Sequence, residues 1–310
     1  MDPRRALDGR ATGIMTVLCL IWGLQQVVLK AAAPDITPLL QIALRSGVAA
    51  LLVGLLMCWR RERLDLASGN WRPGLLVGTL FGLEFLLVGE GLRFTSASHM
   101  VVLLYTAPIF VALGLHWKLP AERLSAMQWL GIAMAFAGIA LAFFGRSQPA
   151  PGGDALDMLW GDLLALLAGA AWGATTVVVR LSSLSRAPAT QTLFYQLSGG
   201  FVILMLAALA LGQTSFRPTA LAWGSLLFQS LIVSFASYLV WFWLLKHYLA
   251  SRLGVFSFLT PLFGMVFGVW LLDEPLEPGF IAGTALVLGG VALVSGYSWL
   301  QQRLREGKRS

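Results

Sequence analysis

Charged residues are scarce in this chain of 310 residues, making up 12% of it, whereas an ordinary soluble domain carries about a quarter. Hydrophobic residues reach 57%. A chain with so few charges and so much apolar surface cannot cover that surface in water. The composition therefore excludes an ordinary soluble domain and indicates a protein whose main solvent is lipid.

Cysteine and histidine are also scarce, at two and three residues. Cys19 and Cys58 lie inside apolar stretches without the CxxC or His-rich spacing of a metal site, so we expect buried packing residues and no metal. His99, His116 and His247 are widely separated near the ends of apolar segments, where interfacial positions are expected. No cofactor is predicted.

Enzymatic signatures are missing as well. The sequence has no HExxH and no Walker A motif, residues 196–199 (QLSG) lack the first glycine of GxSG, and residues 160–162 (WGD) are not GxGD. The net charge of +7 comes from short basic clusters between apolar segments rather than from one groove-sized face. We therefore expect neither an enzyme nor a nucleic-acid-binding protein.

Long apolar segments are what the sequence has in abundance. A spanning helix needs roughly 20 mostly apolar residues, and ten such spans are predicted at residues 12–31, 38–59, 73–93, 97–117, 126–145, 159–180, 189–211, 220–245, 250–272 and 278–298. The first is longer than the apolar core of a signal peptide, so we expect it to be retained as a span. The longest polar interruption, 146–158, is the predicted linker between two five-span halves, 12–145 and 159–298, and 299–310 is a basic cytoplasmic tail.

The distribution of basic residues predicts the orientation. With a cytoplasmic N-terminus, 17 of the 22 lysines and arginines fall at inner ends, four fall at outer ends, and Arg45 lies within a span. Cytoplasmic loops of membrane proteins carry this excess of positive charge. The distribution therefore favours both ten spans and an N-in, C-in arrangement.

The two halves share features that occur in the same order. The matched features are Trp22-Gly23 with Trp172-Gly173, Ser46-Gly47 with Ser198-Gly199, Pro108 with Pro261, Glu122 with Glu274, and Gly131 and Gly138 with Gly283 and Gly290. Because each half has an odd number of spans, the second half must enter the membrane from the opposite side, and the repeat is inverted. Secondary transporters often use inverted repeats to open a midplane site alternately to each face.

This pattern resembles the EamA family of the drug/metabolite transporter superfamily. The shared elements are W-G in the first span of each half, a proline in the fourth, a glutamate shortly after it and G-x6-G-[IV]-A-L in the fifth, over residues 12–297. The resemblance implies an all-α protein of the bacterial inner membrane with a central cavity, exporting amino acids, related metabolites or drugs in exchange for protons. A facilitated-diffusion or uptake carrier, and a non-transporting receptor or lipid scramblase, are the alternatives; substrate and oligomeric state stay open.

Two charges inside spans are the first candidates for a substrate site. A charge near the bilayer centre costs roughly 2.5–3.5 kcal/mol, so it normally faces a partner or a wet cavity. At 1.5 Å per residue, Arg45 and Glu84 lie roughly 10 and 13 Å from the outer ends of their spans. One hypothesis is that Arg45 attracts a carboxylate while Glu84 binds an amine or takes up a proton; the other is a buried structural ion pair.

Polar and aromatic residues in both halves complete the candidate substrate site. They are Trp22, Gln25, Gln26, Tyr105, Trp172, Tyr195, Gln196, Gln229, Tyr238 and Trp241. An aromatic ring beside polar groups can stack on a planar ligand or a cation, although the two deepest tryptophans fit core packing equally well. Pro108 and Pro261 occupy matching positions in the repeat and are candidate hinges or fixed bends.

Overall fold

The computed structural model describes residues 8–62, 69–118, 124–144, 155–248, 257 and 259–306, and these are almost entirely helical. The helices of the first half are α1 (Gly9–Ala32), α2 (Pro38–Trp59), α3 (Trp71–Gly91), α4 (Ala97–Leu104), α5 (Ala107–Lys118) and α6 (Ala126–Phe144). Those of the second half are α7 (Ala155–Leu181), the 3-10 turn η2 (Ser183–Arg186), α8 (Ala189–Ala210), α9 (Ala220–Leu227), the π-helix η3 (Phe228–Ser237), α10 (Tyr238–His247), α12 (Leu259–Leu272) and α13 (Pro278–Glu306).

The helices show a multi-pass membrane protein. Within the described residues, seven helices are long and apolar enough to cross a membrane, with shorter apolar helices at 126–141, 259–272 and 278–293. Each predicted span is mainly helical where the structure describes it, although the fourth is interrupted at residues 105–106 and the third ends at Gly91. The boundaries with the predicted linker and tail also differ. Helix α7 begins inside the predicted linker and α13 continues into the predicted tail. The rest of these two segments, 146–154 and 307–310, lies outside the described residues.

Local sequence explains where several helices begin. The Asp8 carboxylate accepts a hydrogen bond from the Ala11 backbone N–H at 2.8 Å and so caps the start of α1. The same hydrogen bond lowers the pKa of the Asp8 carboxyl. The Ser96 hydroxyl caps α4 and the Thr219 hydroxyl caps α9 in the same way. Pro38 occupies the first position of α2, where its missing N–H costs no hydrogen bond.

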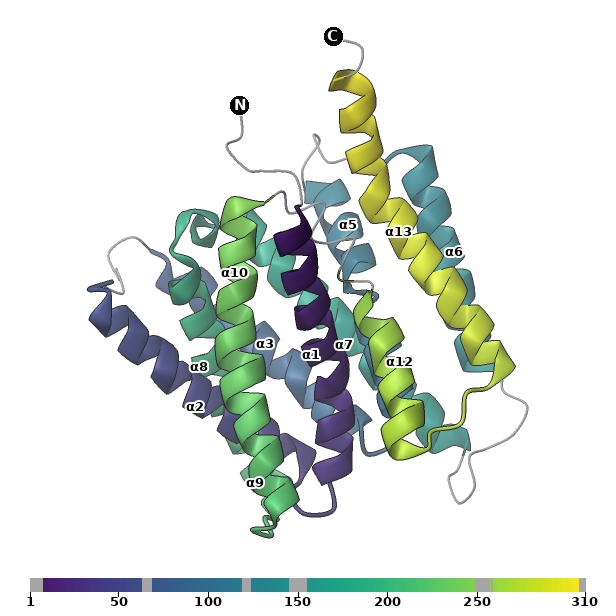
Figure 1. Cartoon of the computed structure of the whole chain (residues 1–310). Coiled ribbons are helices and arrows are strands. Elements are labelled where there is room, and N and C mark those ends of the chain that lie inside the picture. The colour runs from purple at the N-terminus through teal and green to yellow at the C-terminus, as the bar shows by residue number, and fades with distance from the viewer. Residues whose placement is uncertain are drawn as a thin grey trace.

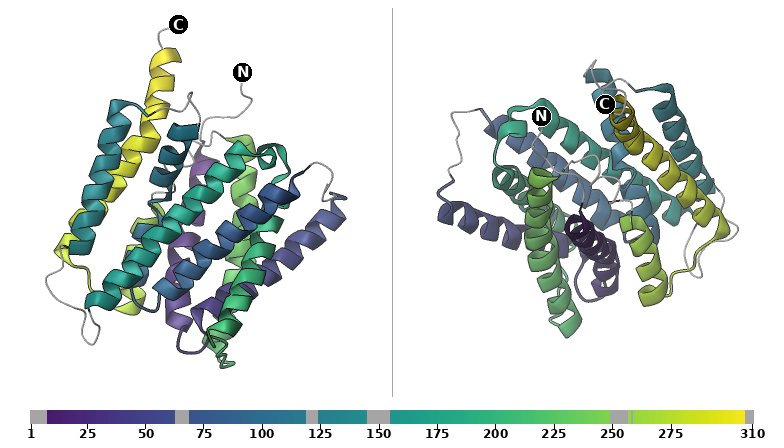
Figure 2. Two further views of the ribbon diagram at one scale, coloured as in Figure 1. Left: turned by 180° about the vertical axis from the view of Figure 1, so that it is seen from behind. Right: turned by 45° about the horizontal axis from the view of Figure 1, so that its top comes forward.

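The helices pack as pairs that cross the boundary between the halves. Helices α6 and α13 lie side by side at one edge of the bundle, and α2 lies against α8 toward the other (Figures 1 and 2). Helix α3 packs on both α7 and α8, while α1 packs on α12. Helix α1 begins and α13 ends at the same end of the bundle (Figure 1).

Glycines allow the closest of these crossings. A Cβ added to Gly199 of α8 would lie 2.5 Å from Cα of Gly78 on α3. A Cβ on Gly138 of α6 would lie 2.5 Å from a backbone oxygen of α13, and one on Gly290 of α13 would lie 2.3 Å from a backbone oxygen of α6. Helices in lipid associate through such close packing because the hydrophobic effect does not drive them together there.

Two helices depart from regular α-helix near the middle of the bundle. Helix α4 ends at Leu104 and α5 begins at Ala107, immediately before Pro108, whose ring cannot continue an α-helix. The Thr106 hydroxyl donates to the Leu103 carbonyl at 2.6 Å and so satisfies a backbone group near the break. In the second half, η3 is π-helical, a rare form that is frequently found at functional sites. Pro261 lies in the first turn of α12, and residues 249–256 and 258 lie outside the described part.

One expectation about cysteine is wrong. Cys19 is buried as predicted, but Cys58 is exposed. It shares the last turns of α2 with Leu55 and Trp59, which are also exposed. An apolar face of this kind is what a helix presents to lipid, so Cys58 does not pack inside the protein.

Candidate functional site

Arg45 in the middle of α2 is 1% exposed. Its Nη1 donates to Oε1 of Gln229 on η3 at 2.5 Å, and its guanidinium carbon lies 4.4 Å from the ring centre of Phe85 on α3. Its Nε and Nη2 are buried without a hydrogen-bond partner among the described residues. A guanidinium presents its donors in a rigid fork that matches a carboxylate. Arg45 therefore has donors available for an anion.

Gln229 holds this arginine in place. Its Nε2 donates to the backbone carbonyl of Gln25 on α1 at 2.8 Å while its Oε1 accepts from Arg45. Gln229 is 0% exposed. Both ends of the amide are thus used within the protein, and the residue ties α1 and α2 to η3 rather than offering a free group to a ligand.

Two more glutamines belong to this polar layer. Gln26 on α1 is buried, and its Oε1 has no hydrogen-bond partner among the described residues. Gln41, one turn before Arg45 on α2, donates to the Ser225 hydroxyl of α9. The sequence prediction included Gln26 but not Gln41.

Glu84 on α3 is 5% exposed and forms no ion pair with Arg45 in the described structure. The buried structural ion pair is therefore not formed. Glu84 nevertheless interacts electrostatically with Arg45, with Tyr105 after α4 and with Tyr238 at the start of α10. Four residues predicted for the site thus lie near one another, with Arg45, Glu84 and Tyr238 on α2, α3 and α10 and Tyr105 just after α4.

Predicted aromatic residues lie in two edge-to-face pairs. The Trp22 ring is 5.6 Å from that of Trp241, and its indole N–H donates to the Ser237 hydroxyl at 2.9 Å. The Tyr105 ring is 5.2 Å from that of Trp172. These contacts join α1 to the η3–α10 helix and α4 to α7. The tryptophans therefore pack at helix contacts, and all three are half-buried.

Tyr195 and Gln196 lie away from this group. The Tyr195 ring packs over Gly74 in the first turn of α3, where an added Cβ would be 2.7 Å from the ring. Ten residues separate Gly74 from Glu84, which is about 15 Å along a helix. Gln196 follows Tyr195 on α8 and is half-buried. The structure therefore does not bring these two residues together with Arg45 and Glu84.

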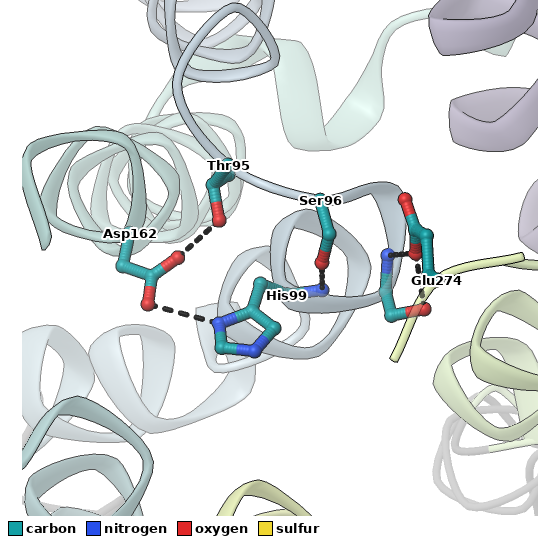
Figure 3. Close-up of polar contacts among 6 residues, drawn as sticks. Thr95, Ser96, His99, Asp162 and Glu274 are labelled. Carbon is teal, nitrogen blue, oxygen red and sulfur yellow. Dashed lines mark hydrogen bonds and ion pairs between the residues drawn. The ribbon is translucent and has the colours of Figure 1, made fainter. Parts of the chain in front are cut away.

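A second polar cluster was not predicted. His99, expected at an interface, is 4% exposed, and its Nδ1 lies 2.9 Å from Oδ2 of Asp162, which is 0% exposed (Figure 3). The signal was present in the sequence, because Asp162 is a carboxylate inside a predicted span, as Glu84 is.

Comparison with known proteins gives the family. The EamA-like transporter family model matches residues 11–144 and again residues 159–296. The uncharacterized transporter YoaV of Bacillus subtilis is 28% identical over 280 residues, covering 90% of this chain and 94% of the relative. A probable amino-acid metabolite efflux pump of Escherichia coli is 25% identical over 94% of this chain and 97% of its own.

A crystal structure with 22% sequence identity covers 96% of this chain and 99% of its own, with a TM-score of 0.64, and so shares the fold. The family match extends over both halves of the chain, and the named relatives are transporters. The chain therefore belongs to the EamA-like transporter family and is a membrane transporter rather than an enzyme.

Proposed function

We propose that this protein is a secondary transporter that exports amino acids or related small carboxylates across the bacterial inner membrane. The observation that carries the proposal is the pair of buried charges on α2 and α3, which form no ion pair with each other although Arg45 has two unused donors. Two such donors can bind a carboxylate in bidentate fashion. Glu84 is suited to bind an amine or to take up a proton on the same substrate-binding face.

The proposed topology is ten crossings in two inverted repeats, with both termini in the cytoplasm. The family model matches the chain twice, which supports two related halves. Equivalent glycines also make equivalent contacts: an added Cβ on Gly23 of α1 would meet residues 260–264, and one on Gly173 of α7 would meet residues 107–111. Such reciprocal contacts are expected when a pseudo-two-fold axis in the membrane plane relates the halves.

Export and proton coupling are the finer parts of the proposal. The name of the Escherichia coli relative supports efflux of amino-acid metabolites. A buried carboxylate without an ion-pair partner is a suitable carrier for a coupling proton, because protonation removes the cost of its charge. The substrate and the proton would then share the Arg45 and Glu84 region between the halves.

Flux measurements in proteoliposomes test this function. Labelled neutral and acidic amino acids, a monocarboxylate and a cationic drug are followed with and without an imposed pH gradient. We expect gradient-stimulated flux for carboxylate solutes, because only these can use both free donors of Arg45. Equal flux with and without the gradient would identify a facilitator, and absence of flux for every solute would overturn the transport proposal.

Glu84→Gln provides the sharper prediction. The amide keeps the shape of the side chain but cannot exchange a proton, so the stimulation by the pH gradient should disappear while protein abundance stays normal. Glu90→Gln is the matched control, because Glu90 lies on the same helix and pairs with Arg93 at 2.7 Å near the helix end. A fall in abundance that parallels the loss of flux in Glu84→Gln would show a structural role and contradict the coupling role.

A further inference from the structure

The first turn of α4 is held by residues from the second half of the chain. On one side, Asp162 of α7 contacts the His99 ring and accepts a hydrogen bond from the Thr95 hydroxyl. On the other side, Glu274 from the α12–α13 connection reaches the start of the same helix (Figure 3). We call Thr95, Ser98, His99, Asp162 and Glu274 the α4 clamp.

The Asp162 contact is a buried pair of titratable groups. An ionised carboxylate can only accept hydrogen bonds, so Nδ1 of His99 carries the shared hydrogen. The His99 ring also stacks on Phe280 of α13, with ring centres 3.8 Å apart and planes 7° from parallel. The ring orientation is thus fixed by α7 on its edge and by α13 on its face.

The Glu274 contact has the form of a helix cap supplied by another segment. Its carboxylate accepts the backbone N–H groups of Ala97 at 2.6 Å and Ser98 at 3.0 Å, and the Ser98 hydroxyl at 2.6 Å. These are amides that the first turn of a helix leaves without intrahelical partners. Separation of Glu274 from α4 would therefore expose them.

Lys30 at the end of α1 is the other charged group that faces this turn. Its Nζ donates to the carbonyls of Leu92 at 2.5 Å and Thr95 at 2.6 Å. Its charge also attracts that of Glu274. The charged groups that hold this turn in the described structure therefore include Asp162 on α7, Lys30 on α1 and Glu274 after α12.

The sequence places this arrangement at one end of the bundle. Trp22 and Trp172 are equivalent in the two halves and lie 150 residues apart, so Asp162 corresponds to Thr12. The equivalent position in the first half thus carries a hydroxyl instead of a carboxylate. The clamp lies where α1, α3 and α12 end and α4, α7 and α13 begin, which is the outer end in the proposed orientation.

We infer that the α4 clamp is a proton-binding latch, with the Asp162 and His99 pair as the proton site, that holds the two halves together at the outer end. The latch function rests on the proposed function, because alternating access requires that end to open and close. The hydrogen bond from neutral His99 already has one ionised partner, the Asp162 carboxylate, and a proton on Nε2 of His99 turns it into an ion pair of two opposite charges. Mild acid at the outer face therefore closes this end more firmly.

Hydrogen exchange of the first turn of α4, measured on the full chain in lipid nanodiscs, tests the latch. Exchange rates are divided by the intrinsic chemical rate at each pH. We then expect the amides of Ala97 and Ser98 to be about tenfold better protected at pH 6 than at pH 8, because the positive charge added to His99 strengthens its attraction to Asp162. Asp162→Asn and His99→Gln should each abolish this difference. Asp157→Asn, which removes an exposed carboxylate from the same helix, should retain it.

Exchange is read without any substrate, so the outcome is independent of the transport assay. Equal protection at both pH values in the wild type would overturn the latch even if transport is observed. A pH difference that survives in both Asp162→Asn and His99→Gln would also overturn it. Conversely, the expected exchange pattern without flux for any solute would support the proton site and reject the proposed transport function.

Discussion

Arg45→Met is expected to abolish carboxylate transport while leaving the protein folded, with a stability close to that of the wild type. Methionine is apolar and of similar length, so it can fill the space between α2, α3 and η3. The change loses the bond to Gln229, worth about 1.5–3 kcal/mol, and the contact with Phe85. It also removes the desolvation penalty of a buried charge, which amounts to several kcal/mol and offsets these losses.

The effect on transport should be large because both unused donors disappear together. Two charge-assisted hydrogen bonds to the substrate are worth at least about 3 kcal/mol, or more than about 100-fold in flux below saturation. Flux in proteoliposomes and the melting temperature of the purified protein are measured on the same preparations. Gln41→Met is the matched control, because it places the same residue one turn earlier on α2, where the lost contact is with Ser225.

The two roles of Arg45 then separate clearly. Loss of flux with an unchanged or raised melting temperature supports substrate binding. Loss of flux together with a lowered melting temperature in Arg45→Met, but not in Gln41→Met, would show that Arg45 only holds the helices together. Unchanged flux would exclude Arg45 from the substrate site.

The helices could be predicted from the sequence because lipid leaves the backbone few choices. A spanning segment must satisfy its polar groups internally, so a long apolar run implies a helix. The boundaries were less certain where polarity does not mark them. Helix α7 takes up the end of the predicted linker, and α13 continues through the start of the basic tail, because helices can extend beyond the hydrocarbon region into water.

The candidate site was predicted in composition but not in its contacts. The cost of a charge in the membrane singled out Arg45 and Glu84, and both are buried. Residue counting gives depth along a helix but not the direction in which each helix faces its neighbours. The bond from Arg45 to Gln229, which lies 184 residues away in the chain, depends on the packing of α2 against η3. Gln229 was predicted for the site, but the sequence did not indicate that it is the hydrogen-bond partner of Arg45.

The α4 clamp was missed for a different reason. Asp162 was considered only as part of a protease motif that the sequence does not contain. Asp162 and Glu84 are both carboxylates within predicted spans, but Asp162 lies only three residues from the start of its span, so the depth argument that identified Glu84 applies to it more weakly. His99 as its partner required knowledge that α4 packs on α7, a contact between the halves that span prediction does not provide.

The second large effect is expected at the crossing of α3 and α8. A Cβ on Gly199 would lie 2.5, 2.6 and 2.7 Å from Cα, C and O of Gly78. All three are backbone atoms, so no side chain can move aside, and the helices themselves must separate. Gly199→Ala should therefore cost about 1–3 kcal/mol of stability, and Gly199→Leu should prevent a stable fold.

Melting temperature and the monodispersity of detergent-purified protein measure this effect. Gly224→Ala and Gly224→Leu are the controls, because Gly224 on α9 is exposed and an added Cβ there meets nothing within 4 Å.

The α3–α8 crossing also affects the candidate site. Gly200, next to Gly199 on α8, faces Phe81, which lies one turn before Phe85 on α3. The same crossing thus sets the position of the ring that lies against Arg45. Unchanged stability in Gly199→Ala would mean that α3 and α8 are further apart than described, and that the contact between Phe85 and Arg45 is not fixed by this crossing.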